Sequence, residues 1–211
     1  MHNAAYEEMD LDWCYVAIPC EKENLVQIAN SLRLMNFKGL NITIPHKKNI
    51  IKVCNNLTTI TSTIQAANTL IPADNNQWIG ANTDVEGFLI PLKNQNLINK
   101  NVVVIGCGGS ARAIVMGLST LNLKQITIIG REKNSLSTFM KDMKNLSNTN
   151  DILIKGILNK KSDVEPYIED ATLIVNTTPI GMNNNNLPGN DIPLGKEIWT
   201  NLSNETILYD L

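Results

Sequence analysis

Two short polar stretches each place one ionisable side chain where an apolar strand should give way to a turn. The first, 38–47, reads Lys-Gly-Leu-Asn-Ile-Thr-Ile-Pro-His-Lys and ends at Lys47; the second, 80–84, reads Gly-Ala-Asn-Thr-Asp and ends at Asp84. Sites on α/β scaffolds are built at such positions, and lysine and carboxylate side chains can transfer protons. Taken alone, each stretch also fits a plainer interpretation, because such a lysine is usually solvated and Asn-Thr-Asp commonly caps a helix.

A third stretch has the glycine spacing of a dinucleotide-binding loop. Residues 106–111 read Gly-Cys-Gly-Gly-Ser-Ala, directly after the apolar run Val102–Ile105 and before a helical pattern. In this context Gly106 permits a tight turn, Gly108 lets backbone N–H groups approach a pyrophosphate, and the small Ala111 lets the helix pack close to the sheet. The pyrophosphate is expected at the helix N-terminus.

The end of the following strand bears on which dinucleotide binds. Residues 130–133 read Gly-Arg-Glu-Lys. An arginine here commonly faces the 2′-phosphate of NADP, whereas an acidic residue bonds the free ribose hydroxyl of NAD. Arg131 and Lys133 together outweigh Glu132 in charge, which favours NADP, although Lys133 also fits a solvated lysine at a helix start. Glu132 keeps NAD open as the alternative.

The spacing of apolar residues predicts strands and helices that bring the first two stretches together. A hairpin is expected to bring Asn68 and Asp84 toward the same end, and Lys47 should lie in the first turn of a helix. In chain order we expect a short helix over 2–9, a buried strand over Trp13–Ile18, a helix over 25–35, a strand over Leu40–Ile44, a helix beginning at Pro45, and paired strands over 66–71 and 77–80 joined by a turn over 73–76.

The second half alternates apolar strands with helices, which predicts a parallel sheet covered on both faces. A helix after Asp84 carries Pro91, which must interrupt it, and the polar run 93–101 suggests a domain junction. We therefore expect two domains, 1–98 and 99–211, the second a doubly wound sheet of the Rossmann type. Its predicted elements are strands over 102–105, 126–129, 152–154, 171–175 and 206–209, helices over 110–121 and 134–146, and a low-complexity surface loop at Asn183–Asn186.

Composition points to a small-molecule partner. The 211 residues carry a formal charge of −2 without a basic stripe or a cationic amphipathic face, which disfavours nucleic acid and membranes. The acidic start without an apolar core predicts a cytoplasmic protein. Cys14, Cys20, Cys54 and Cys107 lack the spacing of a zinc or redox motif, so we expect reduced thiols and no metal.

Together and in this order, these stretches and the later Asn176-Thr-Thr-Pro-Ile-Gly-Met182 resemble the motifs of the shikimate dehydrogenase family. The resemblance covers essentially the whole chain. It implies an N-terminal α/β substrate domain, a dinucleotide domain, and reversible NADPH-dependent reduction of 3-dehydroshikimate to shikimate in chorismate and aromatic amino acid biosynthesis. The partner would be this small molecule, and the protein a monomer or homodimer.

The resemblance also implies residue roles. Lys47 would be the catalytic lysine, the base in oxidation and the acid in reduction, with Asp84 as the group that orients it. Whether Asp84 itself takes part in proton transfer is left open. The implied substrate-binding residues are Asn41, Thr43, Lys47, Asn68 and Asp84, and the implied cofactor-binding residues are Gly106, Cys107, Gly108, Gly109, Ser110, Ala111, Gly130, Arg131, Lys133, Thr177 and Leu211.

The sequence departs from the family pattern at several places. Gly130 and Glu132 replace residues of the usual Asn-Arg-Thr. Family members carry a Ser-x-Ser-Pro turn before the position of Met1 and helices after that of Leu211, so the chain is expected to be a fragment of such an enzyme. Two alternatives stay open: an NAD-preferring quinate/shikimate dehydrogenase, and a non-catalytic dinucleotide-binding relative.

Overall fold

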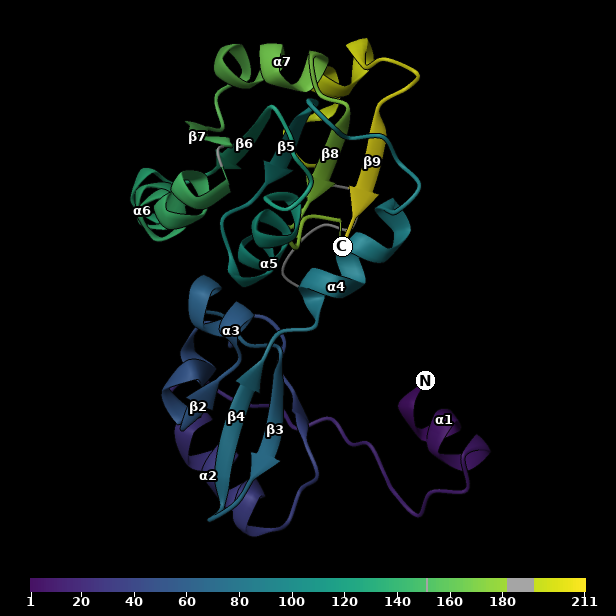
Figure 1. Cartoon of the computed structure of the whole chain (residues 1–211), viewed down its shortest axis with the longest axis vertical. Helices are drawn as coiled ribbons and strands as arrows, with labels where there is room; N and C mark the ends of the chain where they lie inside the picture. The colour runs from purple at the N-terminus through teal and green to yellow at the C-terminus, as the bar shows by residue number, and fades with distance from the viewer. Residues whose placement is uncertain (151, 182–191) are drawn as a thin grey trace.

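The chain folds around two separate sheets, which lie in two lobes (Figure 1). The computed structural model describes residues 1–150, 152–181 and 192–211, the side chains of 145–150 excepted. We call the elements from α1 to β4 the N-lobe and those from β5 to β9 the C-lobe; α4 and η2 connect them. The predicted loop at Asn183–Asn186 lies outside the described residues.

The N-lobe and the connection contain these elements: α1 (His2–Glu8), α2 (Leu25–Leu34), β1 (Leu40–Asn41), η1 (Asn49–Val53), β2 (Asn56–Leu57), α3 (Thr59–Ile64), β3 (Thr69–Ala73), β4 (Gln77–Ala81), α4 (Asp84–Leu89) and η2 (Ile90–Leu92). The C-lobe contains these: β5 (Asn101–Ile105), α5 (Gly109–Leu118), β6 (Gln125–Gly130), α6 (Lys133–Asn150), β7 (Leu153–Leu158), α7 (Lys161–Glu169), β8 (Leu173–Asn176), η3 (Lys196–Asn201) and β9 (Ile207–Asp210).

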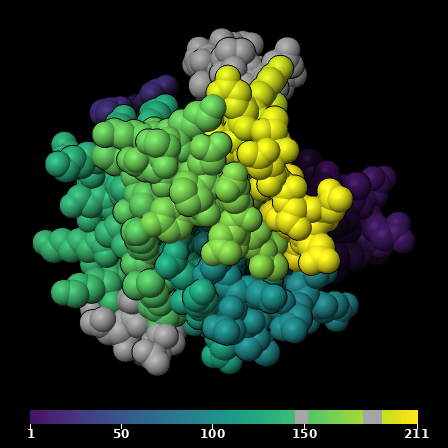
Figure 2. Space-filling model, turned by 90° about the horizontal axis from the view of Figure 1, so that it is seen from above, coloured from purple at the N-terminus to yellow at the C-terminus, as the bar shows by residue number. Residues whose placement is uncertain are grey.

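The C-lobe sheet is parallel throughout, as the apolar strands predict. Its order is β7-β6-β5-β8-β9, and each neighbouring pair runs parallel. Helices α5 and α6 cover one face and α7 with η3 covers the other (Figure 1). The space-filling view from above shows the C-terminal residues, in yellow, lying along the surface beside the green α7–β8 region (Figure 2). Because β5, β6 and β8 run parallel, their carboxyl ends meet at one edge of the sheet.

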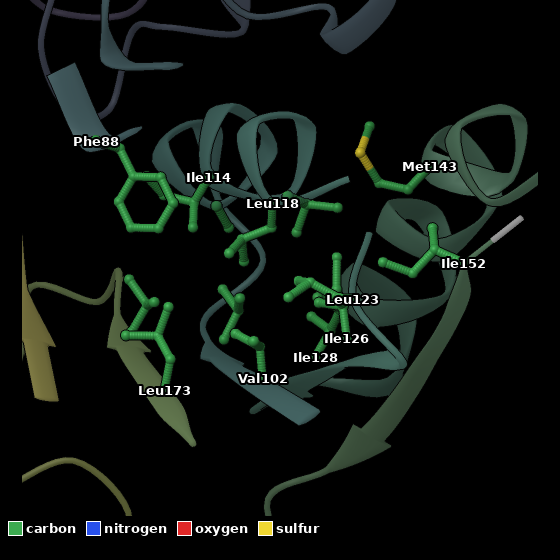
Figure 3. Close-up of a cluster of buried hydrophobic side chains, with 14 of the residues drawn as sticks. Phe88, Val102, Ile114, Leu118, Leu123, Ile126, Ile128, Met143, Ile152 and Leu173 are labelled. Atoms are coloured by element: carbon green, nitrogen blue, oxygen red, sulfur yellow. The ribbon is translucent and has the colours of Figure 1, made fainter. Parts of the chain in front are cut away.

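The main hydrophobic core lies between α5, α6 and this sheet (Figure 3). Val104, Ile114, Leu118 and Ile128 are fully buried there. Phe88 of the connecting helix α4 packs into the same core and meets the Tyr209 ring edge-on, with 5.0 Å between ring centroids. The connection is therefore fixed to the C-lobe by apolar contact. The predicted domain boundary near Asn99 stays a prediction.

The N-lobe sheet is smaller and mixed, with the order β1-β3-β4-β2. The predicted hairpin is confirmed: β3 and β4 pair antiparallel around a turn in which Asn75 and Asn76 adopt positive φ. Beneath it a compact core surrounds Trp78, whose indole N–H donates to the carbonyl of Ala29 on α2 (3.0 Å). The interruption expected at Pro91 also occurs, since α4 gives way there to the 3-10 turn η2.

The predicted buried strand over Trp13–Ile18 is wrong. These residues form no strand and are exposed, Trp13 to 53% and Val16 to 52%. A strand needs a partner edge, and this segment has none, so its backbone is held locally, with the Tyr15 N–H donating to the Asn3 carboxamide (2.5 Å). Residues 1–18, which include α1, form an arm that extends from the rest of the N-lobe, in purple in Figure 1.

Three further expectations change. The strand predicted over Leu40–Ile44 is only two residues long, and no α-helix begins at Pro45. Residues 44–48 form turns after a cis Ile44–Pro45 bond, and the 3-10 helix η1 follows, so Lys47 lies in a turn. Helices α3 and α7 and the 3-10 helix η3 were not predicted, and α7 contains Pro166. Over the residues that the structure describes, no helix is both long and apolar enough to cross a bilayer.

Candidate functional site

A cleft of about 450 Å³ opens between the turn at 44–48 and the carboxyl edge of the C-lobe sheet. Polar and charged side chains line it from both lobes, together with residues 106–110, which we call the glycine loop. This is the arrangement in which open α/β sheets bind ligands. Its polar and glycine lining consists of Lys47, Lys48, Gly106, Cys107, Gly108, Gly109, Ser110, Arg131, Glu132, Ser135, Asn159, Thr177 and Thr178.

Lys47 joins the two lobes at the mouth of this cleft. Its ammonium donates to the Asp84 carboxylate (2.8 Å) and to the Ser110 hydroxyl (3.0 Å), which belongs to the glycine loop. The backbone carbonyl of Lys47 accepts from the Ala67 N–H (2.9 Å), which ties the turn to the start of β3. Because an ammonium has three N–H donors, one is left for a ligand.

Asp84 is held by a network of amides from the N-lobe hairpin. The Asn68 side chain donates to one carboxylate oxygen of Asp84 (2.8 Å), while Lys47 donates to the other. The carboxamide oxygen of the buried Asn82 accepts from the Asp84 N–H (3.0 Å), at the start of α4. The structure thus brings Lys47, Asn68 and Asp84 together, as the sequence predicts, and adds Asn82, which sequence reasoning missed.

The glycine loop makes close approaches that larger residues would prevent. Gly106 has φ +109°, and a Cβ there would lie 2.5 Å from the hydroxyl of Thr177, which in turn donates to the Ile105 carbonyl (2.7 Å). A Cβ on Gly109 would lie 2.9 Å from the Cβ of Lys47. The loop therefore needs glycine both for its turn and for contact with the opposite lobe.

The same loop leaves room for a dinucleotide. A Cβ on Gly108 would meet no atom within 4 Å, although Gly108 lines the cleft and directly precedes α5. The first N–H groups of a helix have no partner within it, and they favour a phosphate group. Open space beside these donors fits the pyrophosphate of the cofactor that the sequence predicts.

Among the other predicted cofactor residues, Arg131 lines the cleft, with its guanidinium 3.7 Å from the Glu132 carboxylate and 84% exposed. Four do not line it. Ala111 is buried in the core, and Gly130 makes room for Leu136, whose Cβ would lie 2.9 Å from an added Cβ. Lys133 opens α6, and Leu211 bonds the Asn176 carbonyl through its backbone N–H (3.3 Å).

Asn41 and Thr43 line a second, larger groove of about 580 Å³ between the arm and α2, not the cleft that contains Lys47. That groove is lined mainly by apolar side chains. His46 turns toward it, with its Nε2 2.8 Å from the Cys20 carbonyl. The segment that carries them nevertheless lies beside Asn68, because the backbone N–H of Ile42 donates to the Asn68 carbonyl (2.6 Å).

Sequence reasoning missed two cations near the cleft. Lys48 lines it beside Lys47, and only its position next to Lys47 could have drawn attention to it. Arg112 is 1% exposed; it donates to the Ile64 carbonyl of the N-lobe (3.2 Å) and to the Asp142 carboxylate of α6. Arg112 therefore connects the lobes behind the glycine loop.

The loop after β8 is held by Asn176. Its carboxamide donates to Asp210 of β9 (2.7 Å) and accepts from the Thr178 N–H (3.0 Å) and hydroxyl (2.7 Å). This places Thr177 and Thr178 on the cleft wall, as expected from the loop motif; Met182 of that motif lies outside the described residues. Within the described ranges, no group of three His, Cys, Asp or Glu side chains could hold a metal ion.

The sequence of the chain is similar to those of known proteins. Residues 1–70 match the family model described as the shikimate dehydrogenase substrate binding domain. The chain is 48% identical, over its full length and 72% of the relative's, to the shikimate dehydrogenase (NADP(+)) of Prochlorococcus marinus (strain MIT 9515).

Solved structures agree. The chain matches shikimate 5-dehydrogenase from Listeria monocytogenes, in complex with shikimate and NAD, with a TM-score of 0.80 and 25% identity; the match covers 99% of this chain and 71% of that one. It also matches a shikimate dehydrogenase in complex with NADP+, with a TM-score of 0.80 and 27% identity over 99% of this chain and 69% of that one.

Proposed function

The chain belongs to the shikimate dehydrogenase family, and from that premise we propose that it catalyses the reversible NADPH-dependent reduction of 3-dehydroshikimate to shikimate. The reaction is a step of chorismate and aromatic amino acid biosynthesis. One observation carries the assignment of the site: the ammonium of Lys47 bonds Asp84 of the connecting helix and Ser110 of the glycine loop at once. A side chain so placed adjoins both the cofactor loop and the substrate side of the cleft.

Lys47 is the proton-transfer group of this proposal. Two of its three N–H donors are held by acceptors, and we propose that the third meets the oxygen of the reacting carbon. In reduction the ammonium gives a proton to the developing alkoxide, and in oxidation the amine accepts the hydroxyl proton. When bound, the nicotinamide supplies or accepts the hydride.

Asp84 and Asn68 orient this lysine. The carboxylate accepts from Lys47 with one oxygen and from Asn68 with the other, which fixes its plane. Pre-orientation of this kind lowers the entropy that must be lost when substrate and lysine meet. We propose that Asp84 and Asn68 also contact the substrate hydroxyls. Asn41 and Thr43, which line the other groove, stay a prediction as substrate residues.

NADP is the proposed cofactor. Arg131 at the end of β6 lies where an arginine meets a 2′-phosphate, and the open space at Gly108 fits the pyrophosphate. Two curated relatives, 45% and 48% identical to the chain, carry NADP(+) in their names. The oligomeric state, a monomer or a homodimer, stays a prediction that sedimentation can test.

The test is turnover of the purified protein with shikimate and NADP+, compared with its Lys47→Ala variant. We expect the variant to lose at least about a hundredfold in kcat, the range that a positioned acid/base group contributes. Lys52→Ala is the matched control, because Lys52 is an exposed lysine on the adjoining η1 and lies outside the cleft. Equal turnover of the Lys47→Ala variant and the control would refute the role of Lys47.

The same assay separates the alternatives. Faster turnover with NAD+ than with NADP+ would favour the NAD-preferring quinate/shikimate enzyme, which Glu132 on the cleft wall allows. Dinucleotide binding without turnover of shikimate or quinate would favour a non-catalytic relative.

A further inference from the structure

The net charge around Arg131 in the cleft is less positive than the sequence of residues 131–133 predicts. Charge counting along 131–133 gives two cations against Glu132, but Lys133 does not line the cleft. Arg131 and Glu132 face each other at 3.7 Å, so the acidic residue offsets the arginine locally. Residues 130–133 alone thus leave little net positive charge for a 2′-phosphate, which carries up to about two negative charges at neutral pH.

Lys48 adds a cation from the opposite lobe. It lines the same cleft as Arg131 and Cys107, although it belongs to the N-lobe turn that carries Lys47. None of the ion pairs between described residues involves Lys48, so its ammonium is not already neutralised by an adjacent carboxylate. Lys48 is exposed, and its long side chain can adjust to a ligand.

Lys48 lines the cleft together with Cys107 of the glycine loop, and charged side chains of α5 and α6 act on it. Partial burial and then the Arg112 guanidinium lower the pKa of Lys48, while Asp142 of α6 and Cys107 act in the opposite sense. Burial and then the Glu132 carboxylate raise the pKa of Cys107, and Arg112, Lys48 and Arg131 counter that rise. Three cations therefore act on one loop residue, and α6 is the helix that follows Arg131.

We propose that Lys48 is a specificity-determining residue for NADP: its ammonium pairs with the 2′-phosphate from the N-lobe while Arg131 faces that phosphate from the C-lobe. The inference rests on the proposed function in that it assumes a dinucleotide in this cleft. Repulsion among the cations in the free protein is relieved when the anion binds, which favours NADP over NAD. The pyrophosphate is served separately, by the loop N–H groups at Gly108.

The proposal links cofactor choice to catalysis. Lys48 adjoins Lys47, and the Lys47 stem packs on Gly109 of the loop. A 2′-phosphate held by Lys48 and Arg131 therefore fixes the N-lobe turn against the C-lobe and helps to hold Lys47 beside Ser110. NAD lacks the group that makes this connection.

The test measures dissociation constants of NADP+, NAD+ and 2′,5′-ADP by calorimetry for the unaltered protein and for Lys48→Gln. We expect NADP+ and 2′,5′-ADP to bind about 5- to 20-fold more weakly to the variant, in keeping with the loss of one exposed charge contact, while NAD+ binding is unchanged. Raising the salt concentration should shrink the difference. Lys48→Arg should restore NADP+ affinity, and Lys52→Gln is the matched control.

Two outcomes would overturn the inference: unchanged NADP+ affinity in Lys48→Gln, or equal weakening of NADP+ and NAD+, which would assign Lys48 to the pyrophosphate. The binding readout needs no turnover. A selectivity shift in a protein that does not oxidise shikimate would refute the proposed function and support the role of Lys48. Turnover with NADP+ combined with unchanged selectivity would support the proposed function and refute the role of Lys48.

Discussion

The two lobes hold their side chains in place by different means. In the C-lobe, Val102 to Ile105 of β5 are each 3% exposed or less, and helices cover both faces of the sheet. In the N-lobe, β1 and β2 have two residues each, and Trp13–Ile18 lies exposed beside the sheet. The C-lobe is thus a frame built by apolar packing, whereas the N-lobe positions Asp84 and Lys47 largely through polar contacts.

The difference shows which part of the site has to be rigid. The dinucleotide loop must keep an unusual backbone, with φ +109° at Gly106, and it rests on the better-packed sheet. The substrate side belongs to the lobe with less buried surface, where local opening costs less free energy.

Hydrogen exchange should show the largest difference. Amides of β5 and β6 lie in the centre of the C-lobe sheet and should exchange only on global unfolding, whereas amides of β1 and β2 should exchange through local opening. We expect protection factors that differ on the order of a thousandfold, which mass spectrometry of peptic peptides measures. Similar protection in both sheets would show that the lobes unfold as one unit.

Gly106→Ala should have the next largest effect, because it changes the backbone of the dinucleotide loop, which rests on the C-lobe sheet. The alanine would have to adopt φ +109° with its Cβ 2.5 Å from the Thr177 hydroxyl, so we expect a loss of about 2–4 kcal/mol in the free energy of unfolding. Urea titration measures it, and dinucleotide affinity should fall as well.

Gly108→Ala is the matched control in the same loop. Its φ is −88° and its Cβ would meet no atom within 4 Å, so the stability should change by less than about 1 kcal/mol. Only dinucleotide affinity should fall, since the methyl group takes space beside the pyrophosphate donors. If both substitutions lowered the free energy of unfolding equally, the positive φ of Gly106 would not be the cause of the destabilisation.

Asn68→Ala tests the polar positioning of the N-lobe. The substitution removes the amide that bonds Asp84 (2.8 Å) and Thr83 (2.9 Å), so Asp84 should lose its orientation toward Lys47. We expect kcat/KM for shikimate to fall about 10- to 100-fold, as small misplacements of catalytic groups do, with unchanged affinity for NADP+.

Asn55→Ala provides the comparison for Asn68→Ala. Asn55 also supports the hairpin backbone, accepting from the Trp78 N–H (3.3 Å), but it does not contact Asp84. Its loss should lower stability slightly and leave kcat/KM unchanged. If both variants lose activity alike, the N-lobe site would depend on general stability and not on the Asn68–Asp84 contact.

The same contrast explains which features the sequence predicts. The central strands β5 and β8 are buried on both faces and therefore read as apolar runs, and each of the five predicted strands overlaps a strand of the sheet, although β7 extends well beyond the predicted 152–154. Trp13–Ile18 looks just as apolar, yet a strand also requires a neighbour, which is information that no single segment contains. Helix α7 was missed because Pro166 and its charged residues mask the helical pattern.

The site divides in the same way. Lys47 and Asp84 were predictable because local motifs place them at strand ends, and the hairpin brings Asn68 beside Asp84. The contact of Lys47 with Ser110, and the presence of Lys48 and Arg131 in one cleft, depend on how the two lobes meet. The spacing of residues within one lobe does not determine how the two lobes pack against each other.

Thiol alkylation gives the smallest expected effect and compares the two lobes directly. Burial raises the pKa of Cys54, at the edge of the N-lobe core, to about 11. Burial also raises the pKa of Cys107 in the C-lobe loop, but nearby cations counter it, and Cys14 is exposed on the arm. Because the thiolate is the reactive form, iodoacetamide at pH 8 should label Cys14 first, Cys107 next and Cys54 last.

The sign of the pH dependence follows from these shifts. A thiol whose pKa is higher in the folded state stabilises that state fully below its unfolded value of about 8.5, and the contribution is lost as pH rises toward 11. Labelling of Cys54 should therefore accelerate between pH 8 and pH 11, followed by mass spectrometry of the tryptic peptides. Cys54 labelling as fast as Cys14 at pH 8 would show that the N-lobe core opens readily, so its polar site would be positioned only while that core is closed.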